Sequence, residues 1–385
     1  MKTTSTKIRY STLLLSIMCL LLIASPYIPQ RVNNIIKLLI EISLVMLTIL
    51  KYKFDKNTVR KMLPISLFFM AICVCTFRIY GLESRSFNAI VTGGTYFVFF
   101  FLIRFFSARY NCMYVSNVIR TNILLYMLIL DLLVILTWGK GLGGLDEAVY
   151  LIGNKFMTSY LHMLILALIN VNRSSLSKWK KTIRILLFLL YSLFICVIAD
   201  TSTGLFGCLT VATVSIIIMW WPRIIQIMSK PYVVIVFFIG LNAVFLLSDF
   251  ILNNTAFESF FMARSHTSTI LSGRVLMYQI SMDAIVQSPI WGYGINYDIV
   301  QKTLSFGNPQ NGILKLLLDY GSVGTVLFCI VLFTTFKNSR FSQYKDLKEA
   351  YIIFVYGMLL CSLVEINLAA IFILACAALN STEGE

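Results

Sequence analysis

Side chains that can bind an anion and transfer a proton gather in one polar stretch of the chain. Residues 264–324 contain Arg264, Arg274, His266 and the neighbouring amides Gln310 and Asn311. An arginine stays protonated and donates in a two-pronged fork, whereas a histidine exchanges its proton near neutral pH. Hydrophobic runs fill the chain on both sides of this stretch. We therefore expect the chemistry of the protein to be located here.

A short amphipathic helix is predicted to begin at Arg274. Ser272 is a suitable N-cap for this helix, and Pro289 ends the pattern. The apolar residues between them share one stripe, which consists of Met277, Ile280, Ala284 and Ile285. Such a helix lies along a membrane surface or over a cavity.

A tight turn is predicted directly after this helix, in the sequence W-G-Y-G. Gly292 and Gly294 permit positive φ angles that other residues rarely adopt. The aromatic pair Trp291 and Tyr293 beside these glycines suits a surface that faces a sugar. Aromatic residues are also common at a membrane interface, so both interpretations stay open.

The elements that must hold this stretch in place are membrane helices. The chain is 58% hydrophobic and 13% charged, with a mean hydropathy of +0.83. Apolar runs of about twenty residues recur along it, which indicates α-helical spans rather than a soluble domain or a membrane barrel. The net charge of +15 comes from Lys and Arg between these runs, as the positive-inside rule expects, and not from a patch that binds nucleic acid. The nine cysteines lie in or beside apolar runs without a C-x-x-C pair, which favours small buried residues over a metal site.

The apolar runs predict spans that start from an N-terminus in the cytoplasm. They lie at about residues 12–28, 34–50, 62–80, 88–106, 122–138, 148–171, 183–199, 204–221, 231–247 and 311–336. A last run, 351–379, forms either one tilted helix or two short halves that break near residues 365–367. The expected fold is an all-α polytopic membrane protein with about 11–12 transmembrane helices. Residues 1–385 then form a single integral membrane domain, in which residues 249–310 make a large, ordered extracytoplasmic loop.

The order of these motifs resembles the O-antigen polymerase and O-antigen ligase superfamily, which includes the Wzy-type polysaccharide polymerases. The family pattern has an arginine, then P-x-x-G-x-G, then H-N and a span that opens with L-x-x-x-x-x-G-x-x-G. The matching residues are Arg274, Pro289, Gly292, Gly294, Asn311, Gly321 and Gly324. Residues 201–204 (T-S-T-G) resemble the family's serine-rich turn, and Glu365 falls where the family often has a glutamate. The resemblance covers roughly residues 200–380.

The resemblance implies a GT-C-like fold and a metal-independent glycosyltransferase that needs no cofactor. The donor would be a polyprenyl-diphosphate-linked oligosaccharide and the acceptor a second lipid-linked repeat unit, joined at the outer face of a bacterial plasma membrane. Membrane lipid and other polysaccharide-assembly proteins are further implied partners, and nucleic acid is not. The family's histidine is Gln310 here, which favours a polymerase over a ligase and leaves the general base open. A ligase is one alternative, and a polysaccharide flippase or other transporter is a second.

The resemblance and the residue chemistry together select individual site residues. The catalytic candidates are Arg264, Arg274, His266, Gln310, Asn311 and Glu365. The substrate-binding candidates are Arg78, Arg85, Trp291, Gly292, Tyr293 and Gly294. In this scheme the arginines face the diphosphate, and His266 takes the place of the missing base. Simpler alternatives are that Arg264 binds lipid headgroups and that Asn311 caps the next helix, and His162, inside a span, is expected to hydrogen-bond a neighbour.

Overall fold

The chain folds almost entirely into helices. The computed structural model describes residues 2–23, 27–52, 56–142, 148–173, 175–252, 274–304, 309–340, 342 and 344–382. The helices of the first half are α1 (Lys2–Cys19), the 3₁₀ helix η1 (Leu20–Leu22), α2 (Gln30–Lys51), α3 (Lys56–Lys61), α4 (Leu63–Tyr80), α5 (Ser84–Arg109), α6 (Cys112–Leu136) and α7 (Lys155–Leu168). Those of the second half are α8 (Lys178–Ile198), α9 (Ser202–Trp220), α10 (Arg223–Met228), α11 (Pro231–Leu252), α13 (Arg274–Gln287), α14 (Ile299–Leu304), α15 (Gly312–Ser339), α16 (Lys345–Cys361) and α17 (Ala370–Asn380).

The predicted polytopic membrane architecture is confirmed in its main features. Seven helices among the described residues are long and apolar enough to cross a membrane, and these are α2, α4, α5, α6, α8, α9 and α15. Shorter apolar helices cover residues 10–22, 155–168, 231–247 and 370–380. Every predicted span overlaps a helix, because hydrocarbon admits backbone only where its polar groups are bonded internally. The total of about 11–12 crossings remains a prediction.

One predicted span differs in its first part. The run expected as helix over residues 148–171 opens with a hairpin, in which β1 (Val149–Tyr150) pairs antiparallel with β2 (Gly153–Asn154). The helix α7 starts only at Lys155, where the Asn154 side chain accepts a hydrogen bond from the Met157 N–H. An asparagine at this position satisfies a free N–H of the first turn and so sets the helix start. The apolar residues Val149 and Tyr150 therefore belong to the hairpin and not to a span.

The last apolar run forms two halves, which confirms one of the two predicted alternatives. Helix α16 ends at Cys361 and α17 begins at Ala370, so the break contains Glu365 and Asn367. The side-chain amide of Asn367 is buried and donates to the Met358 carbonyl at 2.9 Å. Irregular backbone survives inside a membrane protein where it is buried against other protein groups. The break between α16 and α17 meets this condition.

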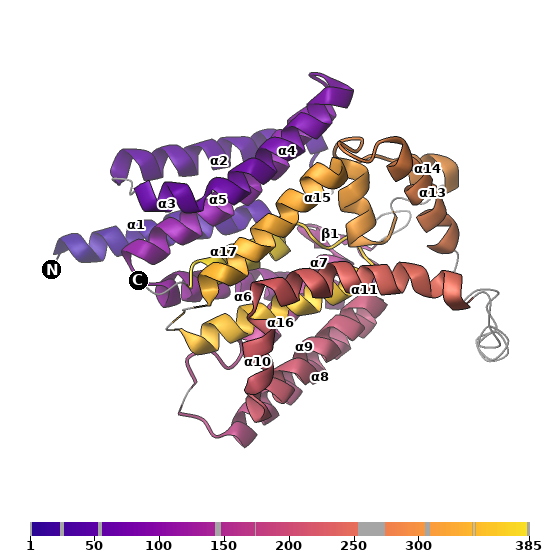
Figure 1. The fold of residues 1–385 in the computed structure, drawn as a ribbon. Coiled ribbons are helices and arrows are strands. Elements are labelled where there is room, and N and C mark those ends of the chain that lie inside the picture. The colour runs from indigo at the N-terminus through magenta and orange to yellow at the C-terminus, as the bar shows by residue number, and fades with distance from the viewer. Residues whose placement is uncertain are drawn as a thin grey trace.

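Helices α5, α16 and α17 form the centre of the bundle. Helix α17 packs against α5, α15 and α16, and all of its residues are buried apart from Ala370 (Figure 1). Its small residues Ala375, Cys376, Ala377 and Ala378 let neighbouring helices approach closely. Helix α2 lies at the periphery, because only 22% of its apolar window is buried against 78% for α5. Lipid is thus the expected neighbour of one face of α2.

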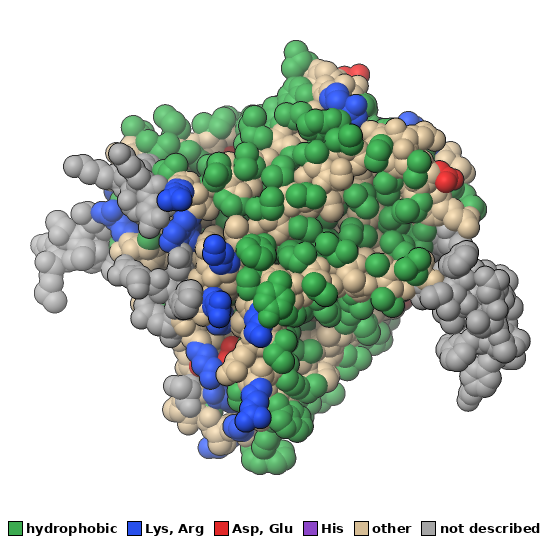
Figure 2. Space-filling view, viewed as in Figure 1, with side chains coloured by type: hydrophobic (Ala, Val, Ile, Leu, Met, Phe, Trp, Pro, Cys, Tyr) green, Lys and Arg blue, Asp and Glu red, His purple; other side chains and the backbone are tan. Residues whose placement is uncertain are grey.

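Positive charge gathers at one end of the bundle. Figure 1 places the N- and C-terminal ends on the same side, and Figure 2 shows Lys and Arg side chains concentrated there. Hydrogen bonds link three helix ends on this side, from Arg104 Nη1 to the Asn380 carbonyl (3.2 Å) and from Asn338 Nδ2 to Asn380 Oδ1 (2.6 Å). We call this side the basic end. The opposite end carries residues 288–298 and 309–311 and the α16–α17 break.

Candidate functional site

Helix α15 is broken at Gly321, and the W-G-Y-G turn docks onto the break. Gly321 has φ 60° and ψ −163°, which interrupts the helical hydrogen bonds on both sides of it. The turn supplies replacements through four backbone hydrogen bonds: Tyr293 N to Leu318 O (2.7 Å), Gly294 N to Asp319 O (2.8 Å), Ser322 N to Pro289 O (2.8 Å) and Val323 N to Ile290 O (3.1 Å). A helix kink inside a bundle is stable when its freed groups find such partners.

Glycine is required at this junction because two backbones touch. The predicted positive φ angles are confirmed at 62° for Gly292 and 82° for Gly294. A Cβ atom on Gly292 would lie 2.6 Å from the Leu318 carbonyl oxygen, and one on Gly321 would lie 2.3 Å from the Ile290 carbonyl oxygen. The two glycine motifs that the sequence shows separately are therefore the two sides of one contact. Both candidate substrate-binding glycines are buried, Gly292 against α15 and Gly294 against Thr76 of α4.

Arginines from α4 and the start of α5 reach the same segment. Arg78 Nη2 donates to the Gly292 carbonyl at 2.8 Å and to Ser288 Oγ at 3.3 Å. Arg85 donates to Tyr80 Oη at 2.6 Å and forms an ion pair with Asp298 at 3.2 Å. The structure thus joins both predicted arginines to residues 288–298. Their contact with a substrate stays a prediction.

Asp298 is held in its charged form by its neighbours. Partial desolvation raises the pKa of this carboxyl, but hydrogen bonds from Lys302 and Arg85 outweigh that effect and hold the pKa below its ordinary value. Asp298 therefore stays a carboxylate at neutral pH and anchors Arg85 beside the turn.

The two aromatic residues of the turn have different surroundings. Tyr293 stacks on Tyr297 with ring centroids 4.1 Å apart, and its hydroxyl donates to the Ala284 carbonyl at 2.9 Å. Trp291 is 39% exposed at the surface of the turn. Tyr293 is thus used to hold the turn on α13, whereas the Trp291 ring is accessible to a ligand or to lipid.

The amide pair opens α15. Asn311 is fully buried, and its Oδ1 accepts hydrogen bonds from Ile313 N and Leu314 N at 3.1 Å each. Its Nδ2 donates to Asn242 Oδ1 at 3.2 Å and to the Leu363 carbonyl at 3.0 Å. Asn311 therefore performs the capping role that was one of the two alternatives, and its contact with a substrate stays a prediction. Gln310 precedes it with φ 45°.

Glu365, the last catalytic candidate that the structure describes, lies in the α16–α17 break close to α15. It is partly exposed, and its Oε1 accepts from Ile366 N at 3.1 Å. The break touches the start of α15 directly, since the Gly312 N–H donates to the Ser362 carbonyl at 2.7 Å. The structure therefore brings Glu365 into the neighbourhood of Asn311.

Three of the predicted catalytic residues cannot be placed by their side chains. Arg264 and His266 lie outside the described residues, as does the expected N-cap Ser272. Arg274 belongs to α13, as predicted, but only its backbone is described, and the residues directly before it lie outside the described ranges. Of the predicted apolar stripe, Met277, Ala284 and Ile285 are buried and Ile280 is half-buried. Helix α13 lies over α15, so it covers protein rather than a bare membrane surface.

Two neighbouring cavities open at this end of the bundle. The deep cavity, of about 240 Å³, is bordered by α4, α5, α15, residues 295–296 and the α16–α17 break. The polar cavity, of about 410 Å³, lies between the starts of α2 and α5 and residues 296–301. Asn88 and Asn296 line both cavities, so these two asparagines mark where the cavities meet.

The deep cavity holds a charged pair that sequence reasoning missed. Lys315 Nζ lies 2.8 Å from Asp319 Oδ1, with side chains 18% and 4% exposed. Asp319 also accepts backbone hydrogen bonds from Asn296 and Tyr297, which fixes the segment that follows the turn. The sequence does show a lysine and an aspartate four residues apart within an apolar span, a pattern that indicates an ion pair on one helix face. The arrangement puts a cation at the cavity wall while Asp319 positions residues 296–297.

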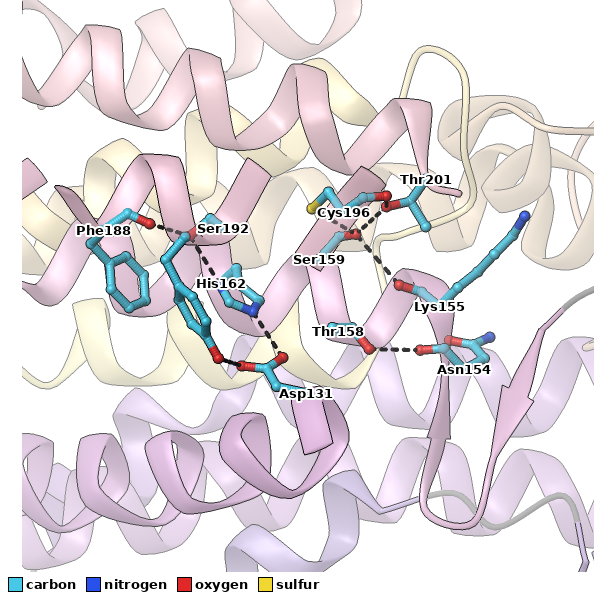
Figure 3. Close-up of polar contacts among 11 residues, drawn as sticks. Asp131, Asn154, Lys155, Thr158, Ser159, His162, Phe188, Ser192, Cys196 and Thr201 are labelled. Carbon is cyan, nitrogen blue, oxygen red and sulfur yellow. Dashed lines mark hydrogen bonds and ion pairs between the residues drawn. The ribbon is translucent and has the colours of Figure 1, made fainter. Parts of the chain in front are cut away.

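A second buried polar network connects α6, α7 and α8 (Figure 3). His162 Nε2 lies 2.9 Å from Asp131 Oδ1 and its Nδ1 lies 2.9 Å from Ser192 Oγ, while the Tyr191 hydroxyl donates to Asp131 Oδ2 at 2.6 Å. The expectation that His162 hydrogen-bonds a neighbour is confirmed. Asp131 escaped notice in the sequence, although an ionisable residue inside a span is itself a signal.

The T-S-T-G turn lies beside this network and packs against α7. Thr201 Oγ1 is 2.9 Å from Ser159 Oγ, and a Cβ on Gly204 would lie 2.1 Å from that same oxygen (Figure 3). The turn therefore joins α7 to α9 at close range. Among the residues described, no three His, Cys, Asp or Glu side chains lie close enough together to hold a metal ion.

One family model matches part of the chain. No curated protein matches the chain. Residues 187–329 match the family model described as O-antigen ligase, and this range includes the docked turn, α13 and the kink at Gly321. The protein is thus a multi-pass membrane protein in which residues 187–329 are similar to the O-antigen ligase family.

Proposed function

We propose that this protein is a polysaccharide polymerase, which joins polyprenyl-diphosphate-linked oligosaccharide repeat units at the outer face of a bacterial plasma membrane. The observation that carries the proposal is the deep cavity with Lys315 at its wall, next to the glycine junction of the family domain. A cavity of this kind, with few polar groups on a largely apolar lining, is typical of a small-molecule site. Gln310, where the family pattern has a histidine, favours the polymerase over the ligase.

The orientation in the membrane follows from charge. Lys and Arg concentrate at the basic end, and cytoplasmic loops carry the excess of these residues (Figure 2). We therefore place the basic end, with both chain termini, in the cytoplasm. Both cavities and the docked turn then open toward the outer face, where the lipid-linked substrates would be used.

The reaction is a displacement at the anomeric carbon of the donor sugar. A hydroxyl oxygen of the acceptor forms a bond to that carbon, while the bond from carbon to the diphosphate oxygen breaks. The diphosphate leaves with the electron pair, and the hydroxyl proton passes to a base, for which His266 remains the candidate. Cations aimed at the departing diphosphate lower the barrier, by about 3–4 kcal/mol for a well-placed donor.

The cations available for the diphosphate come from separate parts of the chain. Lys315 lies at the deep cavity and Arg85 at the polar cavity. Arg264 and Arg274 are the candidates from the predicted outer loop. Asn88 and Asn296, where the cavities meet, are amides suited to hydrogen-bond sugar hydroxyls.

The test is an assay with purified protein in proteoliposomes and lipid-linked repeat units. A polymerase converts single units into a ladder of lipid-linked glycans and releases polyprenyl diphosphate. Transfer to a different acceptor, with no ladder on the polyprenyl lipid, would show a ligase. Movement of intact lipid-linked units between leaflets, with no new glycosidic bond, would show a flippase and refute the proposal.

A further inference from the structure

The face shared by α2 and α5 changes from charged to apolar along the axis of α2. At the opposite end it carries the polar cavity, which Arg31 and Asn34 of α2 line together with Arg85 and Asn88 of α5. Directly beyond lies an apolar groove of about 260 Å³, lined by Leu38, Ile42, Val45 and Met46 of α2 with Phe69 of α4 and Phe97 of α5. Among the residues described, neither the polar cavity nor the groove has any wall within residues 187–285.

The register of α2 places the cavity and the groove on the same face of this helix. Arg31, Asn34, Leu38, Ile42 and Val45 follow at intervals of three or four residues, which places them on one face of the helix. From Arg31 to Met46 this face extends about 22 Å along the helix axis. That length is most of a hydrocarbon core of about 30 Å. A molecule lying on this face would have its charged part at the membrane surface and its chain within the hydrocarbon.

One acidic side chain, Glu41, also lines the groove, but it is buried and hydrogen-bonded. Glu41 lies on the grooved side of α2 but is only 4% exposed, and its Oε1 accepts a hydrogen bond from Thr95 Oγ1 at 2.6 Å. A Cβ on Gly94 would lie 2.4 Å from Glu41 Oε2, so the absence of a side chain at Gly94 makes room for the carboxyl group. The groove thus has a mainly apolar lining, in which the one carboxyl group is already bonded to Thr95.

The polar cavity offers cationic side chains to an anion. Arg31 is exposed at the first turn of α2, where the free N–H groups of the helix start also favour negative charge. Within the part of the chain that the structure describes, no ion pair reaches Arg31. Arg85 forms an ion pair with Asp298, and both side chains line the cavity, so Arg31 supplies the positive charge that no acidic partner balances among the described residues.

We propose that this face binds the lipid of the donor substrate, with the diphosphate in the polar cavity at Arg31 and Arg85 and the polyprenyl chain along the groove. The inference rests on the proposed function and adds to it the place and residues of lipid binding. Charge complementarity favours a diphosphate, which carries more negative charge than the single phosphate of a phospholipid. The contact between the two cavities at Asn88 and Asn296 would put the first sugar, bonded to the diphosphate, into the deep cavity beside Lys315.

The test measures lipid binding without any sugar, so that it is independent of polymerisation. The full-length protein in nanodiscs is irradiated with a photoreactive polyprenyl diphosphate, and with photoreactive phosphatidylglycerol as the comparison lipid. We expect the polyprenyl diphosphate to label peptides of α2 and α5 and to be displaced poorly by phosphatidylglycerol. Equal labelling by both lipids, or labelling confined to other helices, would overturn the inference.

Two matched pairs of variants locate the two parts of the site. Arg31→Ala should weaken polyprenyl diphosphate labelling on the order of tenfold, the loss expected for one charged hydrogen-bonding partner, whereas Arg60→Ala on α3 should not. Ile42→Trp fills the groove, whereas Leu39→Trp adds the same bulk to a lipid-facing position that does not line it. The side chains of Ile42 and Leu39 are both more than half exposed, so a tryptophan at either position should leave the packing between helices unchanged.

The outcomes separate this inference from the proposed function. If Arg31→Ala and Ile42→Trp bind and polymerise like the wild type while the wild type makes polymer, the lipid site is refuted and the polymerase stands. If the labelling pattern is as expected but no ladder forms with any lipid-linked unit, the lipid site stands and the polymerase is refuted. Monodisperse elution of each variant in size-exclusion chromatography checks that it is folded.

Discussion

The contact between the docked turn and the kinked helix predicts a large effect of one methyl group. In Gly321→Ala the new Cβ would lie 2.3 Å from the Ile290 carbonyl oxygen and 2.6 Å from the Gly292 nitrogen. Both neighbours are backbone atoms, so the clash is relieved only if the turn moves away from α15. Such a move breaks some or all of the four backbone hydrogen bonds that join them.

The loss of folding stability in Gly321→Ala has two contributions, backbone strain and lost hydrogen bonds. Gly321 occupies φ 60° and ψ −163°, a region that only glycine adopts freely, and forcing alanine into it costs about 1–3 kcal/mol. Each lost hydrogen bond adds about 1 kcal/mol. We therefore expect Gly321→Ala to destabilise the protein by about 3–6 kcal/mol when two or three of the bonds are lost.

Substitutions at two other glycines separate the cost of backbone strain from the cost of the steric clash. Gly81 has φ 54° with no atom within 4 Å of the position that an alanine Cβ would take, so Gly81→Ala carries the strain alone, about 1–3 kcal/mol. Gly240 lies inside α11 with neither strain nor crowding, so Gly240→Ala should be neutral or stabilise by up to about 1 kcal/mol. Thermal unfolding in detergent measures the stability of the three variants, and we expect the loss of stability to be largest for Gly321→Ala, smaller for Gly81→Ala and absent for Gly240→Ala. Equal stability of Gly321→Ala and Gly81→Ala would show that the close backbone contact does not exist.

The remaining predictions concern chemistry, topology and the second network. Arg274→Ala should leave the protein at normal abundance but abolish long glycan, and Arg274→Lys should restore it only in part, because lysine lacks the planar fork; normal polymer from the alanine variant would contradict the diphosphate role. Activity should persist in chelator, and a loss that magnesium or manganese restores would show a metal requirement. A cysteine at position 268 in place of serine should react with a membrane-impermeant thiol reagent in intact cells, above the background of the unaltered chain; labelling only after lysis would place the loop inside. Asp131→Ala removes two buried hydrogen bonds and should lower stability by about 2–3 kcal/mol, whereas Leu132→Ala on the exposed side of α6 should not; equal melting temperatures would mean that the network contributes nothing to the fold.

The sequence predicted the spans because a membrane constrains each helix separately. Hydrocarbon requires a contiguous apolar run of a certain length, which is a local property that can be read without knowing any contact. The break between α16 and α17 was also visible, since Glu365 and Asn367 interrupt a run too long for one upright helix. The β1–β2 hairpin was not, because V-Y-L-I-G-N is as apolar as the start of a span.

The site was predictable only in part, because its residues meet through long-range packing. The arginines and the glycine turn were visible as residue types. That Gly292 would touch Gly321, or that Arg78 would donate to the Gly292 carbonyl, depends on how α4 and α15 pack. Lys315 and Asp319 are four residues apart in the sequence, but the apolar residues around them made this ion pair easy to overlook. That Arg31 lines a cavity could be seen only once the orientation of α2 was known.

We expect the glycines of the docked turn and of the α15 kink to serve the proposed reaction through backbone position rather than through contact with a ligand. Residues 295–298 follow the turn directly, and the Asp319 side chain holds the N–H groups of Asn296 and Tyr297. Asn296 lines both cavities, so a displacement of the turn from α15 would move a wall of each of them. For this reason a variant such as Gly321→Ala should lose polymer at temperatures well below its unfolding, since the cavities distort before the bundle opens. A glycan yield that declines only in step with unfolding would mean that the junction stabilises the fold without positioning the site.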